Sequence, residues 1–399
     1  MVRLFYPSLS GSRPRARATR SRAALPPQRA RPATSARLIR SSTGAPYRVT
    51  LDTCPDRGAR PARSGHSHLM STPSLTPSIL LASLVGHEGL IIASYAAAVG
   101  LSRELRTQFE RGAVIRLRRG VYIPADIWRQ LTPDEKYLRR IRAYAAVSEE
   151  SLVFTHDSAA AIWGLPRVGA PPIAIHVLVP PAGGGRSSHG VVRHQGDRPG
   201  LVVAQGGLLV TDVATTAVDM ARVLTFPEAV AMMDRAIAVP RFGTALATRD
   251  QLHAALAALP THGHVTGRTD ALRAGEFAVT QSESCGESVS RAFMFLLGFV
   301  IPELQVRFDD ADGFIGFVDF FWRTVNRVGE FDGRGKYVKE EFTHGKTTAE
   351  VVLLEKDREN RVRALGPLVS RWDWDLANDP ARFGAFLTRN GIPRSDLRK

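Results

Sequence analysis

From Pro77 onward, hydrophobic and polar positions fall into short periodic segments separated by glycine, proline and charged turns. The segment 77–124 predicts three short helices followed by a hairpin, in which apolar and basic residues alternate around Gly120. Ser102 is placed to be the N-cap of the third helix, and Glu104 lies in its first turn. A helical unit with a basic hairpin is therefore expected at the start of the globular part.

Residues 125–275 mix the two periodicities and predict an α+β segment. A short strand or turn near 152–155 leads into a helix that ends at Gly164, and Asp212 is a candidate helix cap. Further helices are expected at 134–147, 213–224 and 226–239, and strands at 173–180, 190–195 and 207–212.

Residues 276–399 predict the order α-β-β-β-α-β. The expected helices lie at 284–298 and 347–366, and the expected strands at 302–308, 314–322, 326–333 and 367–374. The fold class is therefore a multi-domain α+β chain. Its expected parts are 1–74, 75–124, 125–275 and 276–399.

The formal charge of +15 is concentrated at the N-terminus. Residues 1–70 hold 14 Arg and two Asp but no Lys or Glu, so +12 of the charge lies there. This Arg-, Pro- and Ala-rich segment predicts a disordered basic tail over 1–74. Three interpretations stay open: translation from a start codon set too early, a nucleic-acid-binding arm, or a targeting peptide.

Two cysteines far apart, Cys54 and Cys285, predict neither a disulfide framework nor a thiolate metal site, which fits the cytoplasm. No apolar run reaches the roughly 18 residues of a membrane span. The histidines His156, His176 and His194 share no metal-ligand spacing, so each is expected to be a satisfied or surface histidine.

Helix, glycine turn, helix and basic hairpin is the order of a winged helix-turn-helix, which binds double-stranded DNA. The third helix and the hairpin would supply the cations. The candidate DNA-binding residues are Arg103, Arg106, Gln108, Arg111, Arg116, Arg118 and Arg119. The alternative is a small helical domain with an ordinary solvated basic face.

Asp319 lies between large apolar residues of a predicted buried strand, where a lone carboxylate is unfavourable. Glu330 and Asp332 alternate on the next strand and would share one face with it. Three carboxylates at a strand end suit Mg²⁺ or Mn²⁺, which prefer oxygen ligands. The alternative is that Asp332 and Gly333 begin a turn, which explains Asp332 but not Asp319.

The acidic residues and the elements around them are similar to those of a known enzyme superfamily. Asp319, the run Glu330 to Gly333 and the helix and strand that follow resemble the PD-(D/E)XK nuclease superfamily, most closely its Vsr-like endonucleases. The resemblance implies a restriction-endonuclease-like α/β domain that hydrolyses DNA with a divalent metal. It implies catalytic roles for Asp319, Glu330, Asp332, Lys336, Glu287 and Gln305.

The sequence departs from that family where a lysine is expected, because Asp332 stands there; Lys336 is the candidate replacement. Glu287 also has a structural explanation, since Ser284 and Glu287 form an S-x-x-E capping box. The basic helix around Arg358 predicts either a phosphate-binding or a salt-bridged solvated face. Arg371 on the last strand is the preferred phosphate contact of this region.

Residues 90–124 resemble the winged-helix domain of AbiEi-type antitoxins, and 154–166 and 207–222 resemble the segment that follows it in actinobacterial relatives. The resemblance implies phage defence or a toxin-antitoxin system with a cognate toxin as partner. Thr215 stands where those relatives carry an arginine. The function expected is a DNA-binding protein with a metal-dependent endonuclease domain, without a membrane or small-molecule cofactor. The alternative is a non-catalytic antitoxin or repressor with a degenerate nuclease fold.

Overall fold

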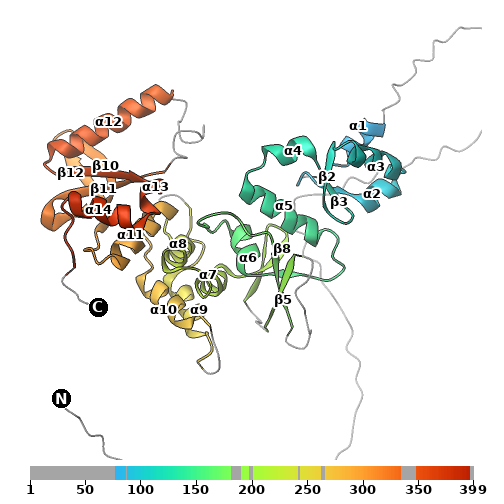
Figure 1. Ribbon diagram of the computed structural model, residues 1–399, viewed down its shortest axis with the longest axis horizontal. Helices are drawn as coiled ribbons and strands as arrows, with labels where there is room; N and C mark the ends of the chain where they lie inside the picture. Colours follow the sequence, from blue (N-terminus) through green and yellow to red (C-terminus); the bar gives the residue numbers. More distant parts are fainter. Residues whose placement is uncertain are drawn as a thin grey trace, which may run out of the picture. The chain divides into compact units, whose positions relative to one another are not determined.

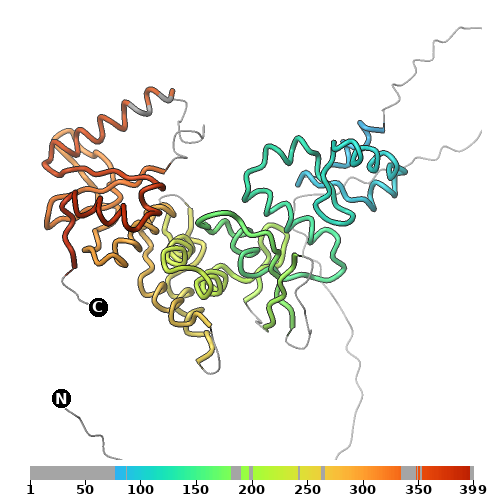
Figure 2. The backbone as a smooth tube through the Cα atoms, viewed as in Figure 1, coloured from blue at the N-terminus to red at the C-terminus, as the bar shows by residue number. Residues whose placement is uncertain are grey.

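The computed structural model describes residues 77–86, 88–180, 190–196, 201–240, 243–261, 266–333 and 347–395. They form a mixed α+β structure with three sheets (Figure 1). Each sheet is built from strands that are consecutive in the chain. Figure 2 traces the course of the backbone from blue at the N-terminus to red at the C-terminus. The tail expected over 1–74 and Lys336 lie outside the described residues. No described helix has the length and apolar character needed to cross a membrane.

Residues 77–124 form the three predicted helices and the predicted hairpin, to which the short strand β1, not expected from the sequence, adds to make an antiparallel sheet of order β1-β3-β2. Leu81, Ala96, Leu105 and Val114 are buried in their common core. The elements are α1 (Pro77–Ala82), β1 (Ile91–Ile92), α2 (Ala93–Ala98), α3 (Ser102–Glu110), β2 (Val114–Arg118) and β3 (Val121–Pro124).

The start of α3 differs from the prediction by one residue. Ser102 is the first helical residue, and the N-cap position is Leu101, which makes no side-chain capping bond. Leu101 is buried beside Leu105 in the core, so apolar packing determines where this helix begins. Glu104 does lie in the first turn, as expected.

Residues 125–211 form a five-stranded mixed sheet of order β6-β5-β4-β8-β7. Helices α5 and α6 pack on it, with Tyr137 and Ile141 against Phe154 and Val177. The predicted strands are observed as β5, β6 and β8, whereas α4 and β7 were not expected. The elements are α4 (Ala125–Gln130), α5 (Pro133–Ala145), β4 (Val153–Phe154), α6 (His156–Trp163), β5 (Ile175–Val179), β6 (Val191–Gln195), β7 (Val202–Gln205) and β8 (Leu208–Thr211).

A layer of helices follows, with alanine and methionine side chains in its core. Asp212 caps its first helix by accepting a hydrogen bond from Thr215 N, as predicted. The last helix of this region, α11, contributes Ala292 to the same core. The elements are α7 (Val213–Ala221), α8 (Phe226–Ile237), α9 (Arg249–Ala257), α10 (Arg268–Phe277) and α11 (Cys285–Leu296).

The last sheet has the order β12-β11-β10-β9, and its only parallel pair among the described strands is β11 with β12. Met294 of α11 and Phe383 of α14 pack on one face, and Val362 of α12 packs on the other. The expected order α-β-β-β-α-β is observed. The elements are β9 (Glu303–Asp310), β10 (Gly313–Trp322), β11 (Arg327–Asp332), α12 (Thr348–Ala364), β12 (Leu368–Asp373), α13 (Trp374–Ala377) and α14 (Pro380–Arg389).

A buried ion pair joins α8 to α11. Arg291 Nη2 lies 3.2 and 3.0 Å from the two carboxylate oxygens of Asp234, and the side chains are 3% and 1% exposed. Ser288 Oγ and Val279 N also donate to Asp234, at 2.8 and 2.7 Å. The carboxylate is therefore fully surrounded by donors, as a buried charge requires.

Replacing Arg291 by Ala would leave Asp234 buried without its cation. We expect the free energy of unfolding to fall by about 3–5 kcal/mol, the range for one partner removed from a buried pair. Urea unfolding measures the change. The matched control is Arg307→Ala, which removes the exposed pair of Arg307 with Asp309 and should leave the urea midpoint nearly unchanged. Equal small effects of the two substitutions would contradict this view of the α8–α11 contact.

Candidate nucleic-acid interface and acidic cluster

Helix α3 carries an exposed face of arginines. Arg103 and Arg106 are exposed and lie one turn apart on α3, whereas Leu105 is buried in the core, and Arg111 follows directly after the helix. Within the described part of the chain, no ion pair joins Arg103 or Arg106 to a carboxylate. Their charges are therefore available to a ligand.

Gln108, expected on the same face, has an internal role instead. Its amide nitrogen donates to Glu104 Oε1 at 2.7 Å and to Ser78 Oγ at 3.1 Å, and Ser78 Oγ also donates to Glu104 at 2.7 Å. The bond from Gln108 and then the bond from Ser78 lower the pKa of Glu104. Gln108 thus ties α3 to α1 through its hydrogen bond to Ser78.

The arginines of the hairpin turn to different sides. Arg116 lies over the ring of Phe109 on α3, 5.4 Å from its centroid, whereas Arg118 lies over Tyr144 on α5, at 4.1 Å. The register of β2 against β3 shifts between the two arginines, and such a bulge turns the following side chain to the other face. Arg116 and Arg118, both candidate DNA-binding residues, therefore lie on different faces of the hairpin.

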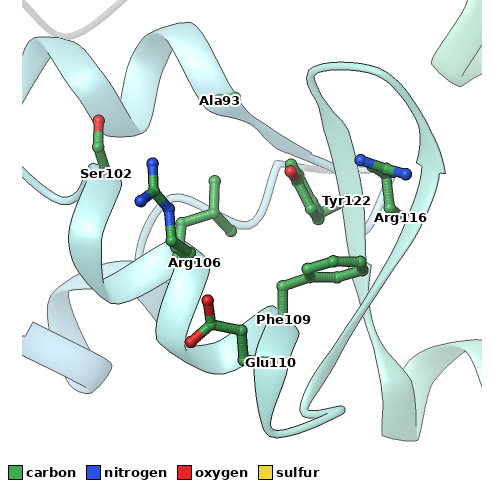
Figure 3. A pocket seen from close by; sticks show the side chains of 8 residues that line it. Ala93, Ser102, Arg106, Phe109, Glu110, Arg116 and Tyr122 are labelled. Atoms are coloured by element: carbon green, nitrogen blue, oxygen red, sulfur yellow. The ribbon is translucent and has the colours of Figure 1, made fainter.

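A groove of about 370 Å³ lies between α3 and the hairpin. Ser102, Arg106 and Glu110 come from the helix, and Arg116 and Tyr122 face them from the strands (Figure 3). Phe109 packs edge to face on Tyr122, with 5.6 Å between centroids, and forms an aromatic wall. The groove thus combines cations, hydroxyl groups and aromatic rings. Arg119 is exposed in the turn of the hairpin.

In the C-terminal sheet, Glu287, Gln305 and Asp319 come together from α11, β9 and β10. Gln305 Nε2 donates to Glu287 Oε2 at 3.1 Å and to Asp319 Oδ1 at 3.3 Å. Phe331 N donates to Asp319 Oδ2 at 2.8 Å. The sequence predicts that the Asp319 carboxylate needs partners. In the structure Asp319 is only partly buried, and the fold supplies it with an amide and a backbone N–H.

Gln305 holds a left-handed backbone conformation, with φ of +49°. Residues two apart in a strand normally share a face, but Leu304 packs with the Phe320 cluster and Val306 with the Val318 cluster on the opposite face. The unusual backbone at Gln305 therefore turns β9 over at the position where its amide bridges the two carboxylates. Such strain outside glycine is typical of functional positions.

Glu287 is buried on α11. Burial, and next the charge of Asp319, raise the pKa of Glu287 to about 7. Ser284 is the N-cap, accepting from Glu287 N at 3.2 Å, as the capping box predicts. The returning bond of the carboxylate goes to Glu283 N at 3.0 Å rather than to the N-cap residue. Capping therefore explains only part of the position of Glu287.

The carboxylate of Glu330 forms an ion pair with an arginine. Arg358 Nη2, from α12, lies 2.7 Å from both carboxylate oxygens of Glu330. Burial raises the pKa of Glu330 while the charge of Arg358 opposes that rise. Arg358 Nη1 also donates to Phe317 O at 3.2 Å, which holds the guanidinium against β10.

Arg371, expected to contact phosphate, is surrounded by carboxylates instead. Its Nη2 lies 2.5 Å from Asp332 Oδ1, and its Nη1 lies 3.2 Å from Glu355 and 3.0 Å from Glu359. These hydrogen bonds and charges, that of Asp332 first, raise the pKa of the Arg371 guanidinium. The cation is therefore already neutralised inside the protein.

The set of Asp319, Glu330 and Asp332 expected to hold Mg²⁺ or Mn²⁺ does not fit that ion. Glu330 is paired with Arg358, Asp332 with Arg371, and Asp319 with Gln305 and Phe331 N. No group of three His, Cys, Asp or Glu residues in the described ranges could hold a metal ion. The sequence favours Arg371 as a phosphate contact and leaves the helix of Arg358 open between a phosphate-binding and a salt-bridged face; in the fold both arginines pair with carboxylates. Lys336, the expected catalytic lysine, lies outside the described residues.

Three histidines that sequence spacing kept apart lie together in the middle sheet. His176 Nδ1 lies 2.9 Å from His194 Nε2, and the rings of His156 and His194 stack with 3.6 Å between centroids. Burial lowers the pKa of His176. The parallel register of β5 and β6 pairs Leu178 with His194, which puts His176 and His194 on one face. The pairing of β5 with β6 therefore brings these histidines together, and their spacing along the sequence does not reveal it.

No protein-family model matches the chain. The chain is similar to two uncharacterized proteins of Mycobacterium tuberculosis, Rv2248 of strain H37Rv and MT2308 of strain CDC 1551. Each is 29% identical over 296 residues, which cover 72% of this chain and 96% of the relative. A solved structure, that of the Rv2827c protein of Mycobacterium tuberculosis, is similar with a TM-score of 0.32 and 15% identity, over 53% of this chain and 79% of that chain.

Because the pKa of Glu287 is raised, the stability of the folded chain should depend on pH. Because the pKa is about 7 in the folded chain and near 4.5 otherwise, stability is expected to fall as the pH rises through that interval. Glu287→Gln keeps an acceptor oxygen but cannot ionise. We therefore expect its melting temperature to exceed that of the wild type at pH 8 and to match it more closely at pH 5.

The control for this measurement is Glu303→Gln, whose exposed carboxylate has a pKa lowered by Arg323. Its effect on the melting temperature should be the same at pH 5 and pH 8. If the Glu287→Gln difference were also constant over that range, the protonation of Glu287 would have no part in stability.

Proposed function

We propose that residues 75–124 are a winged helix-turn-helix that binds duplex DNA, and that the chain acts as a non-catalytic DNA-binding regulator. One observation carries this proposal: Arg103 and Arg106 of α3 have no carboxylate partner among the described residues. By contrast, Arg358, Arg361 and Arg371 of the C-terminal part each form an ion pair. Binding to phosphates gains affinity by releasing their counterions, and only uncompensated cations do this efficiently.

The geometry of α3 and the hairpin supports the DNA-binding mode. A helix of this kind enters the major groove, while a basic hairpin beside it contacts the backbone. Arg103, Arg106 and Arg111 project from the helix side, and Arg116 and Arg119 project from the hairpin. Arg118 contributes less in this arrangement, because its guanidinium lies on Tyr144.

The C-terminal part supports the non-catalytic alternative more than the endonuclease. Its order of elements, with Asp319 and Glu330 on neighbouring strands, is the one that suggested a PD-(D/E)XK nuclease. Arg358 nevertheless occupies the oxygens of Glu330 that a divalent ion would need. We therefore propose a restriction-endonuclease-like domain that keeps the framework without the metal centre. A cognate toxin as partner, and a role in phage defence, follow from the AbiEi resemblance alone.

Arg103→Ala and Arg106→Ala should each weaken binding to duplex DNA. Removing the phosphate contact of Arg103 should also reduce the slope of log affinity against log salt by about 0.9. Fluorescence anisotropy at several salt concentrations measures both. Arg361→Ala, which removes an equal charge that is paired with Asp310, is the control and should leave both nearly unchanged. Indistinguishable salt slopes for all three variants and the wild type would move DNA binding away from α3.

Incubation with plasmid DNA tests the catalytic alternative directly. Because Glu330 is held by Arg358, we expect no nicking or cleavage with Mg²⁺ or Mn²⁺ above the level of an Asp319→Ala variant. Agarose gels over a time course detect either product. Cleavage by the wild type that disappears in Asp319→Ala would replace the regulator with an endonuclease.

A further inference from the structure

The groove beside α3 contains a carboxylate that DNA phosphates would repel. Glu110 is exposed at the end of α3, one turn after Arg106, and both side chains line the groove (Figure 3). In the described part of the chain, no hydrogen bond or ion pair joins the Glu110 carboxylate to another residue. It is not paired with Arg106 either, although side chains four apart on a helix can meet.

A carboxylate next to bound DNA is favourable only if it meets a donor, because every backbone phosphate is an anion. The major groove offers such donors on the edges of bases. A carboxylate accepts from the amino group of cytosine N4, and arginine donates to O6 and N7 of guanine. The side chains of Arg106 and Glu110 are therefore chemically matched to G·C base pairs.

The distance between Arg106 and Glu110 along the helix would allow both side chains to contact bases at the same time. Four residues of α-helix rise about 6 Å, and successive base pairs are about 3.4 Å apart. A helix lying along the groove would place Arg106 and Glu110 within about two base pairs of each other. Ser102 and Arg116, on the two walls of the groove, remain to hold the flanking phosphates.

We propose that Arg106 and Glu110 are the specificity-determining residues of α3, with Arg106 selecting guanine and Glu110 selecting cytosine within two base pairs. This inference rests on the proposed DNA binding and names the sequence class that the same surface reads. The remaining arginines of the surface hold phosphates and carry no base preference.

Selection from a randomised duplex library by the purified full chain tests the proposal. The wild type should enrich a motif with a guanine and a cytosine within two base pairs. Glutamine pairs with adenine rather than cytosine. Glu110→Gln should therefore change the cytosine position to adenine, with a shift in relative affinity of roughly 5- to 150-fold, and leave the guanine position unchanged. Glu110→Ala should lose the preference at that position without acquiring a new one.

The matched control is Asp250→Asn, which removes one exposed carboxylate from α9 and should leave the motif unchanged. A uniform gain in affinity for all sequences in Glu110→Gln would overturn the inference, because the carboxylate would then only repel phosphates. DNA binding by the wild type without any base preference would also overturn it, while leaving the proposed function intact. Absence of DNA binding by the wild type would instead contradict the proposed function itself.

Discussion

The buried contact between Asp234 and Arg291 is the constraint on which the second half of the chain depends. Neither charge can be exposed by a small movement, so α8 and α11 must keep their positions along each other. On its other side, α11 approaches the C-terminal sheet closely: a Cβ on Gly286 would lie 2.0 Å from Phe331, and Trp372 donates to Ser290 at 2.9 Å. One helix thus belongs to two cores, and its position brings Glu287 to Asp319.

The distribution of paired and unpaired charge separates two surfaces that are both rich in arginine. In the C-terminal part, Arg358 neutralises Glu330, a carboxylate that would otherwise be buried alone, and Arg371 pairs with the more exposed Asp332, so these arginines have an internal role. On α3, Arg103 and Arg106 contribute nothing of this kind in the described structure. A cation without an internal task is available to an external anion. That physical difference, and not the number of arginines, distinguishes the proposed DNA-binding surface from the salt-bridged surface.

Periodicity and turn residues predicted most of the regular structure. The three helices and hairpin after Pro77, the strands β5, β6 and β8, and the order of elements from α11 to β12 are observed. These are local properties of the chain, since each depends on which side of an element meets apolar neighbours. Predictions that failed concerned single residues, and the reason lies in tertiary packing. Ser102 is not the N-cap because Leu101 packs in the core.

The sequence by itself determined most of the elements, the exposed arginines of α3 and the need of the Asp319 carboxylate for partners. Only the tertiary structure decided which partners those carboxylates have, because they come from residues far along the chain. Arg358 reaches Glu330 from α12, and Gln305 reaches Asp319 through a left-handed backbone. Similarly, a register shift of β2 turned Arg118 onto Tyr144, away from Arg116. Periodicity specifies which face a residue occupies, but only packing in three dimensions specifies which opposite charge meets it there.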